Sequence, residues 1–291
     1  MEILPQLIVN GTMAGTIYAI VAIGLVVIFS ATGIVNFAQG EAATIGAYLG
    51  LVFYKVLGLP YWLSFIAAIA VAALFWVAVD RGLMRSILNA PAFTKVFLTF
   101  ALAILIQNLL RFIFEDNLFS MPPVFGGKAI QLGIVSVRPA YLSILFVAAI
   151  VVAVLFFWFR RAKIGKAMRA TSQNQEAAQL MGVSIKRIYS FTWAMGGALG
   201  AIAGLLLAPL FGIDPGMGGL TLIKGFMAAI IGGFTSLPGA LLGGLLLGVI
   251  ETLSGVYVST AFKDLFTFAV LVVFILWRPQ GLLGKTPSVK V

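Results

Sequence analysis

Long apolar runs alternate with short polar connections along this 291-residue chain. A run of about 20 apolar residues is long enough to cross the hydrocarbon core of a bilayer as a helix. Seven runs each predict one such span: Leu7–Phe29, Phe37–Leu57, Trp62–Val79, Val96–Phe114, Ala140–Phe159, Ile188–Phe211 and Leu265–Trp277. The pattern therefore predicts an all-α integral membrane protein.

One further run, Leu222–Leu253, is too long for a single ordinary span, because about 32 residues of helix measure roughly 48 Å. Gly232-Gly233 and Pro238-Gly239 interrupt it. We therefore expect two spans joined by a tight turn near Ser236. The total is about nine transmembrane helices, within a range of eight to ten, in a single transmembrane domain over residues 1–291.

The longest polar segment between two apolar runs covers residues 160–187. It carries seven bases against one acid, Glu176, and the bases are Arg160, Arg161, Lys163, Lys166, Arg169, Lys186 and Arg187. Basic loops of this length stay on the cytoplasmic side of a membrane. The segment is therefore predicted to be the main cytoplasmic loop.

This loop also has the pattern of a folded helix. Ser172 and Gln175 have capping-box spacing, good helix formers follow, and Gly182 can end the helix. We expect a helix from Ser172 to Met181, roughly 15 Å long. The candidate docking residues are Ser172, Glu176, Ala177, Ala178, Met181 and Gly182. Two interpretations remain open: the helix docks on a partner, or the loop only fixes topology and keeps the surface soluble.

Composition agrees with a bilayer protein, since 62% of the residues are hydrophobic and 10% are charged. The chain has no cysteine and no histidine, which excludes disulfides, thiolate or imidazole metal sites and Ser–His or Cys–His nucleophile pairs. The sequence also lacks paired carboxylates and metal-ligand spacings. We therefore expect no catalytic residues, no metal site and no enzyme activity.

The net charge of +10 is explained by membrane orientation. Nine spans place three basic segments on one side: residues 80–95, the loop 160–187 and the tail from Arg278. The bases expected on the other side are Lys55, Arg111, Lys128, Arg138, Lys224 and Lys263. The positive-inside rule then puts the N-terminus outside and the C-terminus in the cytoplasm, and no nucleic-acid partner is needed.

Pro279–Thr286 reads PQGLLGKT, which matches the phosphate-binding loop GxxxxGK[ST] except at its first glycine. Such a loop needs a preceding strand and a following helix to direct its amides at phosphate. This segment instead follows an apolar span and runs into Pro287. We therefore expect no nucleotide or other cofactor to bind this chain.

Polar residues at membrane depth are the candidates for a transport path. The segment from Ser30 to Glu41 has no base and is too short for a proper loop. Irregular backbone at that depth is tolerated where it is buried in protein or lines a wet cavity. The candidates are Asn36, Gln39 and Glu41 from this segment, with Gln107 and Asn108 from the fourth span. Asn36, Gln39 and Glu41 are expected to touch a passing solute or hold its gate. Gln107 and Asn108 line the path or only bond between helices. Glu251 is a further acid at membrane depth, and the alternative for both acids is that each reaches an interface or caps a helix.

Several of these stretches, in the same order, resemble one known family. They are IVNFAQGE at Ile34–Glu41, GKAMRA and EAAQLMGV in the basic loop, AAIIGGFTSLPGALLGGLLLGVIE, and the terminal RPQGLLGK. Together they resemble the Liv-type permeases, the membrane subunits of ABC importers for branched-chain amino acids, and most closely the H-type subunit. The resemblance runs over nearly the whole chain.

The resemblance implies a vitamin-B12-importer-like permease fold in a bacterial inner (plasma) membrane. It implies four kinds of partner: a second, related permease subunit, two cytoplasmic ATPase subunits that use ATP-Mg, an external substrate-binding protein, and membrane lipid. It also implies that the EAA…G segment at Glu176, Ala177, Ala178 and Gly182 is the coupling helix that docks on an ATPase. Close variants of the family carry amides, urea or aromatic acids.

Two functions of other classes remain possible at this point. An ion-coupled secondary transporter would use Glu41 or Glu251 and would work alone. A channel or a structural membrane subunit would show no dependence on ATP.

Overall fold

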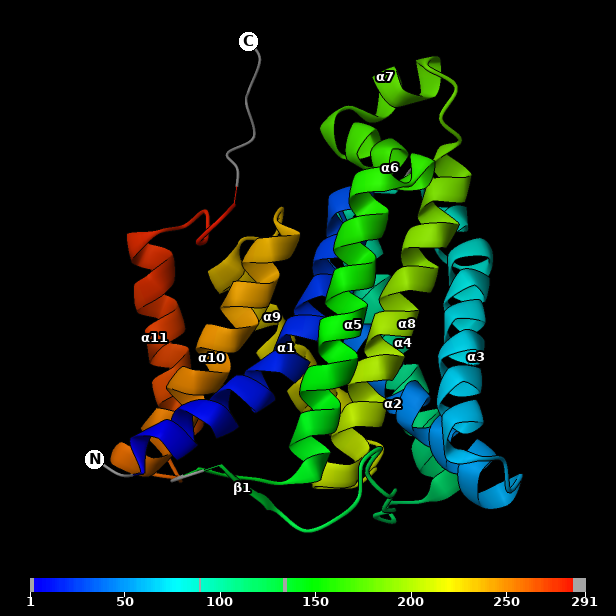
Figure 1. Ribbon diagram of the computed structural model, residues 1–291. Helices are drawn as coiled ribbons and strands as arrows, with labels where there is room; N and C mark the ends of the chain where they lie inside the picture. The colour runs from blue at the N-terminus through cyan, green and yellow to red at the C-terminus, as the bar shows by residue number, and fades with distance from the viewer. Residues whose placement is uncertain (1–2, 89, 133–134, 285–291) are drawn as a thin grey trace.

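The computed structural model of the chain is a bundle of helices with one small β-hairpin (Figure 1). It describes residues 3–88, 90–132 and 135–284. The α-helices are Leu4–Thr32 (α1), Gln39–Leu51 (α2), Tyr61–Gly82 (α3), Ala92–Phe114 (α4), Pro139–Arg161 (α5), Lys163–Gln173 (α6), Gln175–Leu180 (α7), Ile185–Phe211 (α8), Met217–Gly232 (α9), Leu237–Tyr257 (α10) and Lys263–Trp277 (α11). The shorter elements are a π-helical turn, Val52–Val56 (η1), a 3₁₀ turn, Met84–Ile87 (η2), and the antiparallel strands Ile130–Leu132 (β1) and Val135–Val137 (β2).

Every range predicted to span contains a helix, and the long run after Leu222 is divided as expected. Gly233, at φ 102°, ends α9, and Ser236 caps α10 by accepting a hydrogen bond from the N–H of Gly239 at 3.1 Å. Within the described residues, 6 helices are long and apolar enough to cross a membrane: α1, α3 with η2, α4, α5, α8 and α10. Because α2, α9 and α11 are shorter, the total of nine spans stays a prediction.

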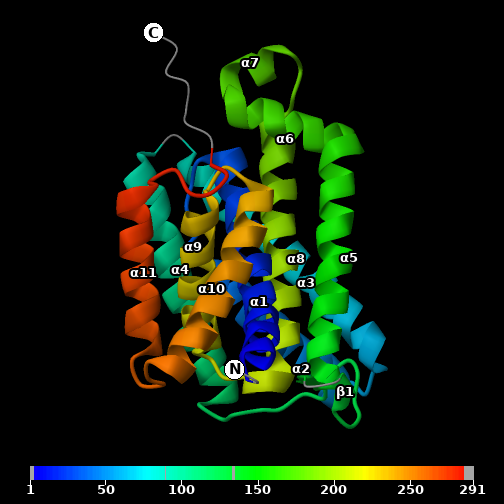
Figure 2. The same ribbon diagram turned by 60° about the vertical axis from the view of Figure 1, so that its left-hand side comes forward.

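The bundle is organised around α1, which packs against α10, α8 and α9 (Figures 1 and 2). Glycines allow α1 and α10 to touch through their backbones. A Cβ added at Gly15 would lie 2.5 Å from the carbonyl oxygen of Gly244, and one added at Gly11 would lie 2.7 Å from Cα of Val249. Small residues at such crossings let helices approach closely, so that van der Waals contact replaces the hydrophobic drive that lipid does not supply.

The helices α6 and α7 lie at one end of the bundle and the hairpin β1–β2 lies at the other (Figures 1 and 2). In the first turn of α1, Gln6 binds strand β2 twice: its Oε1 accepts from the N–H of Ser136 at 2.7 Å, and its Nε2 donates to the carbonyl of Ser136 at 2.9 Å. The start of α1 is therefore at the end opposite the basic loop. This is the relative placement that the charge pattern predicts, and which end faces the cytoplasm stays a prediction.

Candidate translocation segment and coupling platform

The helical chain is interrupted between α1 and α2, as the sequence predicts. Gly33 ends α1 in the left-handed region, at φ 69°, and residues 33–38, here called the unwound segment, precede α2. The hydroxyl of Thr99 in α4 accepts a hydrogen bond from the N–H of Phe37 at 3.1 Å, and Oδ1 of Asn36 accepts from the N–H of Ala38 at 3.0 Å. These bonds satisfy backbone groups that a helix would otherwise pair.

Gln39 is completely buried, at 0% exposure, and it links three helices. Its Nε2 donates to the carbonyl of Gly196 in α8 at 2.8 Å, and Nδ2 of Asn36 donates to its Oε1 at 3.4 Å. Gly24 in α1 leaves room for the amide, since a Cβ there would lie 2.5 Å from Nε2 of Gln39. Irregular backbone at membrane depth must either be buried in packed protein or line a wet cavity. Around Asn36 and Gln39 the structure shows packed protein.

Glu41 lies in the first turn of α2 and is also buried. This turn packs tightly on the start of α9, where a Cβ at Gly40 would lie 2.1 Å from the carbonyl oxygen of Gly218. In the part of the chain that the structure describes, Glu41 has no ion-pair partner. The partial positive charge at a helix N-terminus favours a carboxylate at this position.

Gln107 and Asn108 lie on α4 but face different ways. Gln107 is half-buried and lies at the turn before α9, where a Cβ at Gly216 would be 3.7 Å from its Nε2. Asn108 is exposed and donates from Nδ2 to the carbonyl of Ile104 on its own helix at 2.8 Å. Among the described residues, no hydrogen bond joins this pair to the Asn36–Gln39 group, so the structure does not link them directly.

Glu251, the other acid at membrane depth, is part of an ion cluster between α9, α10 and α11. Its Oε1 lies 3.1 Å from Nζ of Lys224 and 3.3 Å from Nζ of Lys263, and Lys224 also pairs with Asp264. Lys224, expected among the bases on the external side, lies within α9 and is 8% exposed. Lys224 and Glu251 form the buried pair, and the more exposed Lys263 and Asp264 each add an opposite charge to it, which lowers the cost of burial.

The basic loop folds as two helices, α6 and α7, which together we call the platform. The expected helix from Ser172 to Met181 is wrong in its start and its length, because Ser172 belongs to α6 and its hydroxyl donates to the carbonyl of Arg169 at 2.9 Å. The cap of α7 is Asn174, whose Oδ1 accepts from the N–H of Ala177 at 3.0 Å. Asparagine before a run of helix formers is a strong N-cap signal, and it was available in the sequence.

The two faces of α7 differ. Ala178 is buried against Ile185 and Tyr189 of α8, so it faces its own chain, and the expectation that it meets a partner is corrected. Glu176 and Ala177 are exposed, and the tip carries Leu180 and Met181 at 89% and 85% exposure. Gly182, at φ 83°, turns the chain back toward α8.

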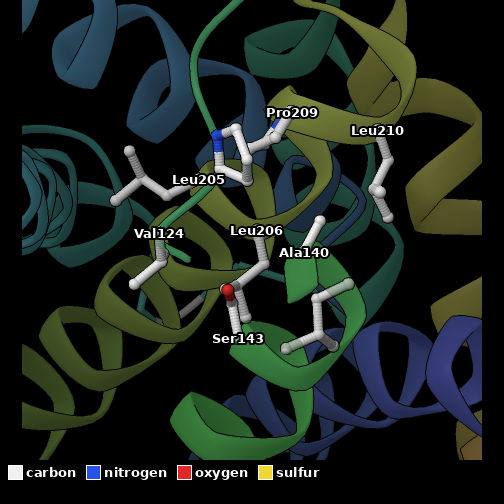
Figure 3. A pocket seen from close by; sticks show the side chains of 9 residues that line it. Val124, Ala140, Ser143, Leu205, Leu206, Pro209 and Leu210 are labelled. Atoms are coloured by element: carbon white, nitrogen blue, oxygen red, sulfur yellow. The ribbon is translucent and has the colours of Figure 1, made fainter. Parts of the chain in front are cut away.

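Two hollows occur near these elements. The one in Figure 3 lies between α5, the end of α8 and the segment before α5, and its lining includes Val124, Leu205, Leu206 and Pro209. The hydroxyl of Ser143, its one polar side chain, already accepts from the N–H of Phe125 at 2.9 Å. A second cleft of about 460 Å³ lies between α6, the end of α1 and the turn before α10. It separates the platform from α10.

An interrupted helix buried in a bundle of apolar helices, with a folded platform at one end, is typical of a polytopic membrane transport subunit. The sequence profile of one family, described as "Branched-chain amino acid transport system / permease component", matches residues 7–275. The chain belongs to this family.

Curated relatives agree with this assignment. The high-affinity branched-chain amino acid transport system permease protein LivH of Salmonella typhimurium is 32% identical, over 98% of this chain and 97% of that protein. The corresponding permease protein BraD of Pseudomonas aeruginosa is 31% identical over the same shares. A probable LivH of Methanocaldococcus jannaschii is 28% identical, over 96% of this chain and 92% of that protein.

The chain is therefore an ABC transporter permease subunit and not an enzyme, and it is a multi-pass membrane protein. The resemblance to the Liv-type permeases is confirmed. The near-match to a phosphate-binding loop ends at Lys285 and Thr286, and these two residues lie outside the described part of the chain.

Proposed function

We propose that the chain is the H-type permease subunit of an ATP-driven importer for branched-chain and other hydrophobic amino acids. The observation that carries this proposal is the near full-length match to permeases named for branched-chain amino acids. The importer would contain a second, related permease subunit and two cytoplasmic ATPases, and an external protein would deliver the substrate. It would lie in the bacterial inner (plasma) membrane, and ATP-Mg would bind the ATPases rather than this chain.

The platform is the proposed docking site for an ATPase. Leu180 and Met181 project from the tip of α7 with nearly all of their surface exposed. Exposed apolar side chains at the end of a folded loop suit insertion into a groove of a partner protein. Docking is also consistent with the positive-inside charge pattern, which puts the platform in the cytoplasm and the start of α1 outside.

The substrate path is proposed to run along α4, between this chain and the second permease subunit. Most of α4 is uncovered in the chain alone, and its exposed surface includes Asn108 in the membrane region. A polar amide is costly against lipid and is accommodated against protein or water. The unwound segment, bound to α4 through Thr99, would then act as the gate. Asn36 and Gln39 would keep it closed, and Glu41 follows it in the first turn of α2.

The same machinery could carry amides, urea or aromatic acids, and the choice would rest mainly with the external binding protein. The rival function, ion-coupled transport through Glu251, is less well supported because two lysines already compensate that carboxylate. Glu41 remains the acid on which an ion-coupled mechanism would depend.

The test is reconstitution of the chain with a second permease subunit, the ATPases and a binding protein of the same kind of importer. Vesicles containing the complex should accumulate leucine, isoleucine or valine only when ATP and the loaded binding protein are both present. Uptake by this chain alone, driven by an ion gradient, would replace the importer with a secondary transporter. ATP-dependent uptake of urea or amides instead would keep the machinery and change the substrate.

Orientation can be tested separately, since the chain has no native cysteine. A single cysteine at Ser236, in the turn before α10, should react with a membrane-impermeant reagent from the cytoplasmic side. A cysteine at Gly126, near the hairpin end, should react from outside. Reaction of Ser236→Cys from outside only would invert the proposed topology.

A further inference from the structure

A buried charge lies between the platform and the membrane helices. Asp80, in the last turn of α3, is 0% exposed. Its Oδ2 accepts a hydrogen bond from the hydroxyl of Ser190 in α8 at 2.6 Å and lies 3.3 Å from Nε of Arg85 in η2. Such a buried ion pair is weak evidence for a role in stability, because a well-packed apolar group in its place is often as stable.

Arg85 also contacts α8, through a second nitrogen of its guanidinium. Its Nη2 donates to the carbonyl of Lys186 at 3.0 Å and lies 2.6 Å from Oγ of Ser190. One guanidinium therefore joins η2, the end of α3 and the first two turns of α8. Lysine could not make this set of contacts, since only the planar fork of arginine presents several fixed donors.

The same turns of α8 carry the platform. Ala178 of α7 packs on Ile185 and Tyr189, and Leu88, directly after η2, packs on this cluster as well. Gln175, at the start of α7, donates a hydrogen bond to the hydroxyl of Tyr189. The residue that receives α7, Tyr189, is thus next in sequence to Ser190, which binds Asp80.

Below this point α3 and α8 are packed as one unit. The rings of Trp76 and Trp193 stack with centroids 5.7 Å apart, and a Cβ at Gly197 would lie 2.1 Å from the Trp76 ring. A displacement of α8 therefore moves α3 with it, because close-packed interfaces shift as units and do not deform gradually.

We propose that Asp80, Arg85 and Ser190 form a transmission node. These positioning residues make α3 and the start of α4 move together with α8 when a partner protein binds α7 and displaces it. This inference rests on the proposed function. The path has two arms. The first arm connects the node through η2 to α4, where the hydroxyl of Thr99 binds the unwound segment. The second arm runs along α8 to Gly196, whose carbonyl binds the side chain of Gln39. Both sides of the proposed gate are then moved by one event at the platform.

The carboxylate of Asp80 has one oxygen that Arg85 and Ser190 do not bind. Its second oxygen, Oδ1, is buried and has no hydrogen-bond partner among the described residues. Buried polar atoms without partners are uncommon. Oδ1 is therefore available to a donor outside the node as neighbouring groups move, while Arg85 and Ser190 stay bound to Oδ2.

The first test compares Ser190→Ala with Ser190→Thr in the reconstituted importer. Removal of the hydroxyl should lower the amount of substrate imported per ATP hydrolysed by about threefold or more, the size expected for loss of one coupling contact. The ATPases should still co-purify, the substrate concentration for half-maximal uptake should hold, and Ser190→Thr should restore coupling. A normal import-to-ATP ratio in Ser190→Ala, or loss of ATPase binding together with the ratio, would overturn the node.

Arg85→Gln and Arg81→Gln provide a matched pair. Arg81 is exposed on the turn next to Asp80 and has no ion pair in the described part of the chain. Only Arg85→Gln should uncouple import from ATP hydrolysis; equal effects of the two changes would show a general charge effect and reject the proposal. If the wild-type importer shows no ATP-dependent uptake, the proposed function is wrong, and the proposal of a transmission node is rejected together with it.

Distance measurements give a readout that does not depend on activity. Spin labels at Gln179→Cys on α7 and Thr94→Cys on α4 should keep a constant separation with and without a non-hydrolysable ATP analogue. In the Ser190→Ala background the separation should change between the two states. A constant separation in both backgrounds would mean that Ser190 is not needed for the joint movement and would contradict the proposal.

Discussion

The side-chain amide of Gln39 donates a hydrogen bond to the main-chain carbonyl of Gly196 at 2.8 Å, joining the first residue of α2 to the middle of α8. Both groups are buried, and the carbonyl also accepts a hydrogen bond within α8. Loss of the amide therefore removes one buried interhelical hydrogen bond, at a cost of about 0.5–1.5 kcal/mol. This bond fixes where the unwound segment ends and is the contact that we expect to change when the gate opens.

Gln39→Leu should therefore lower the maximal rate of import while the substrate concentration for half-maximal uptake stays nearly constant, because the binding protein sets the latter. Initial rates of uptake in reconstituted vesicles measure both quantities. Gln280→Leu, at an exposed amide after α11 and outside the platform, is the control and should behave as wild type. An unchanged rate in Gln39→Leu, or a change in which substrate is carried, would contradict the gate assignment.

Leu180→Asp should weaken binding of the ATPase, because it puts a charge into the proposed apolar contact at the tip of α7. Gln179→Asp adds the same charge to a neighbouring exposed position and should leave binding intact. Co-purification with a tagged ATPase, followed by its basal ATP hydrolysis, compares the two variants. Equal binding by both would mean that the tip of α7 is not the docking surface.

Ala178→Asp should act differently from Leu180→Asp. It buries a charge against Ile185 and Tyr189 and should unfold the platform, since an unpaired buried carboxylate is strongly disfavoured. Limited proteolysis within residues 163–182 should become faster in this variant and stay unchanged in Leu180→Asp. Equal protease resistance in all variants would contradict the burial of Ala178.

Gly15→Val should destabilise the bundle, by about 1–3 kcal/mol or more, because a larger side chain overpacks the contact with α10. Gly219→Ala is the control, since nothing lies within 4 Å of a Cβ added there. Thermal unfolding in detergent, followed by tryptophan fluorescence, measures the difference. A similar midpoint for Gly15→Val and wild type would show that α1 and α10 are not in direct backbone contact.

Lys224→Met should destabilise the protein by about 3–5 kcal/mol because it leaves Glu251 buried with one base fewer. The double variant Lys224→Met with Glu251→Gln should recover much of this loss, as removal of both partners leaves no uncompensated charge. The same thermal assay tests the pair. A double variant that is less stable than Lys224→Met alone would show that Glu251 has another role.

The positions of the helices were largely predictable from sequence, because apolar runs of a given length define them. The turn at Ser236 and the interruption at Gly33 were predicted for the same reason, since glycine and proline interrupt an apolar pattern locally. The side on which a residue lies was harder to predict. The burial of Lys224 was not predicted, because its partners Glu251 and Asp264 come from helices later in the chain and spacing cannot show that three helices meet.

The candidate site was predicted in part. The unwound segment and the platform were both located, but Ala178 and Gln39 were assigned outward or solute-facing roles that depend on how α8 packs. The platform's cap was missed because the Ser172 pattern and the Asn174 pattern compete, and only the geometry of α6 decides between them. Asp80, Arg85 and Ser190 have no shared motif, and their proximity is visible only in the folded chain.

The backbone contact between α1 and α10 has a consequence for biosynthesis. Gly11 and Gly15 of α1 contact α10, a helix near the C-terminal end of the described chain, so this half of α1 must remain in the membrane without that partner until most of the chain has been inserted. During that interval its small-residue face can bind another helix, including one from a neighbouring chain. Chains that stop before α10 should therefore be recognised and degraded, and a newly made copy should need a protein that shields α1 until synthesis is complete.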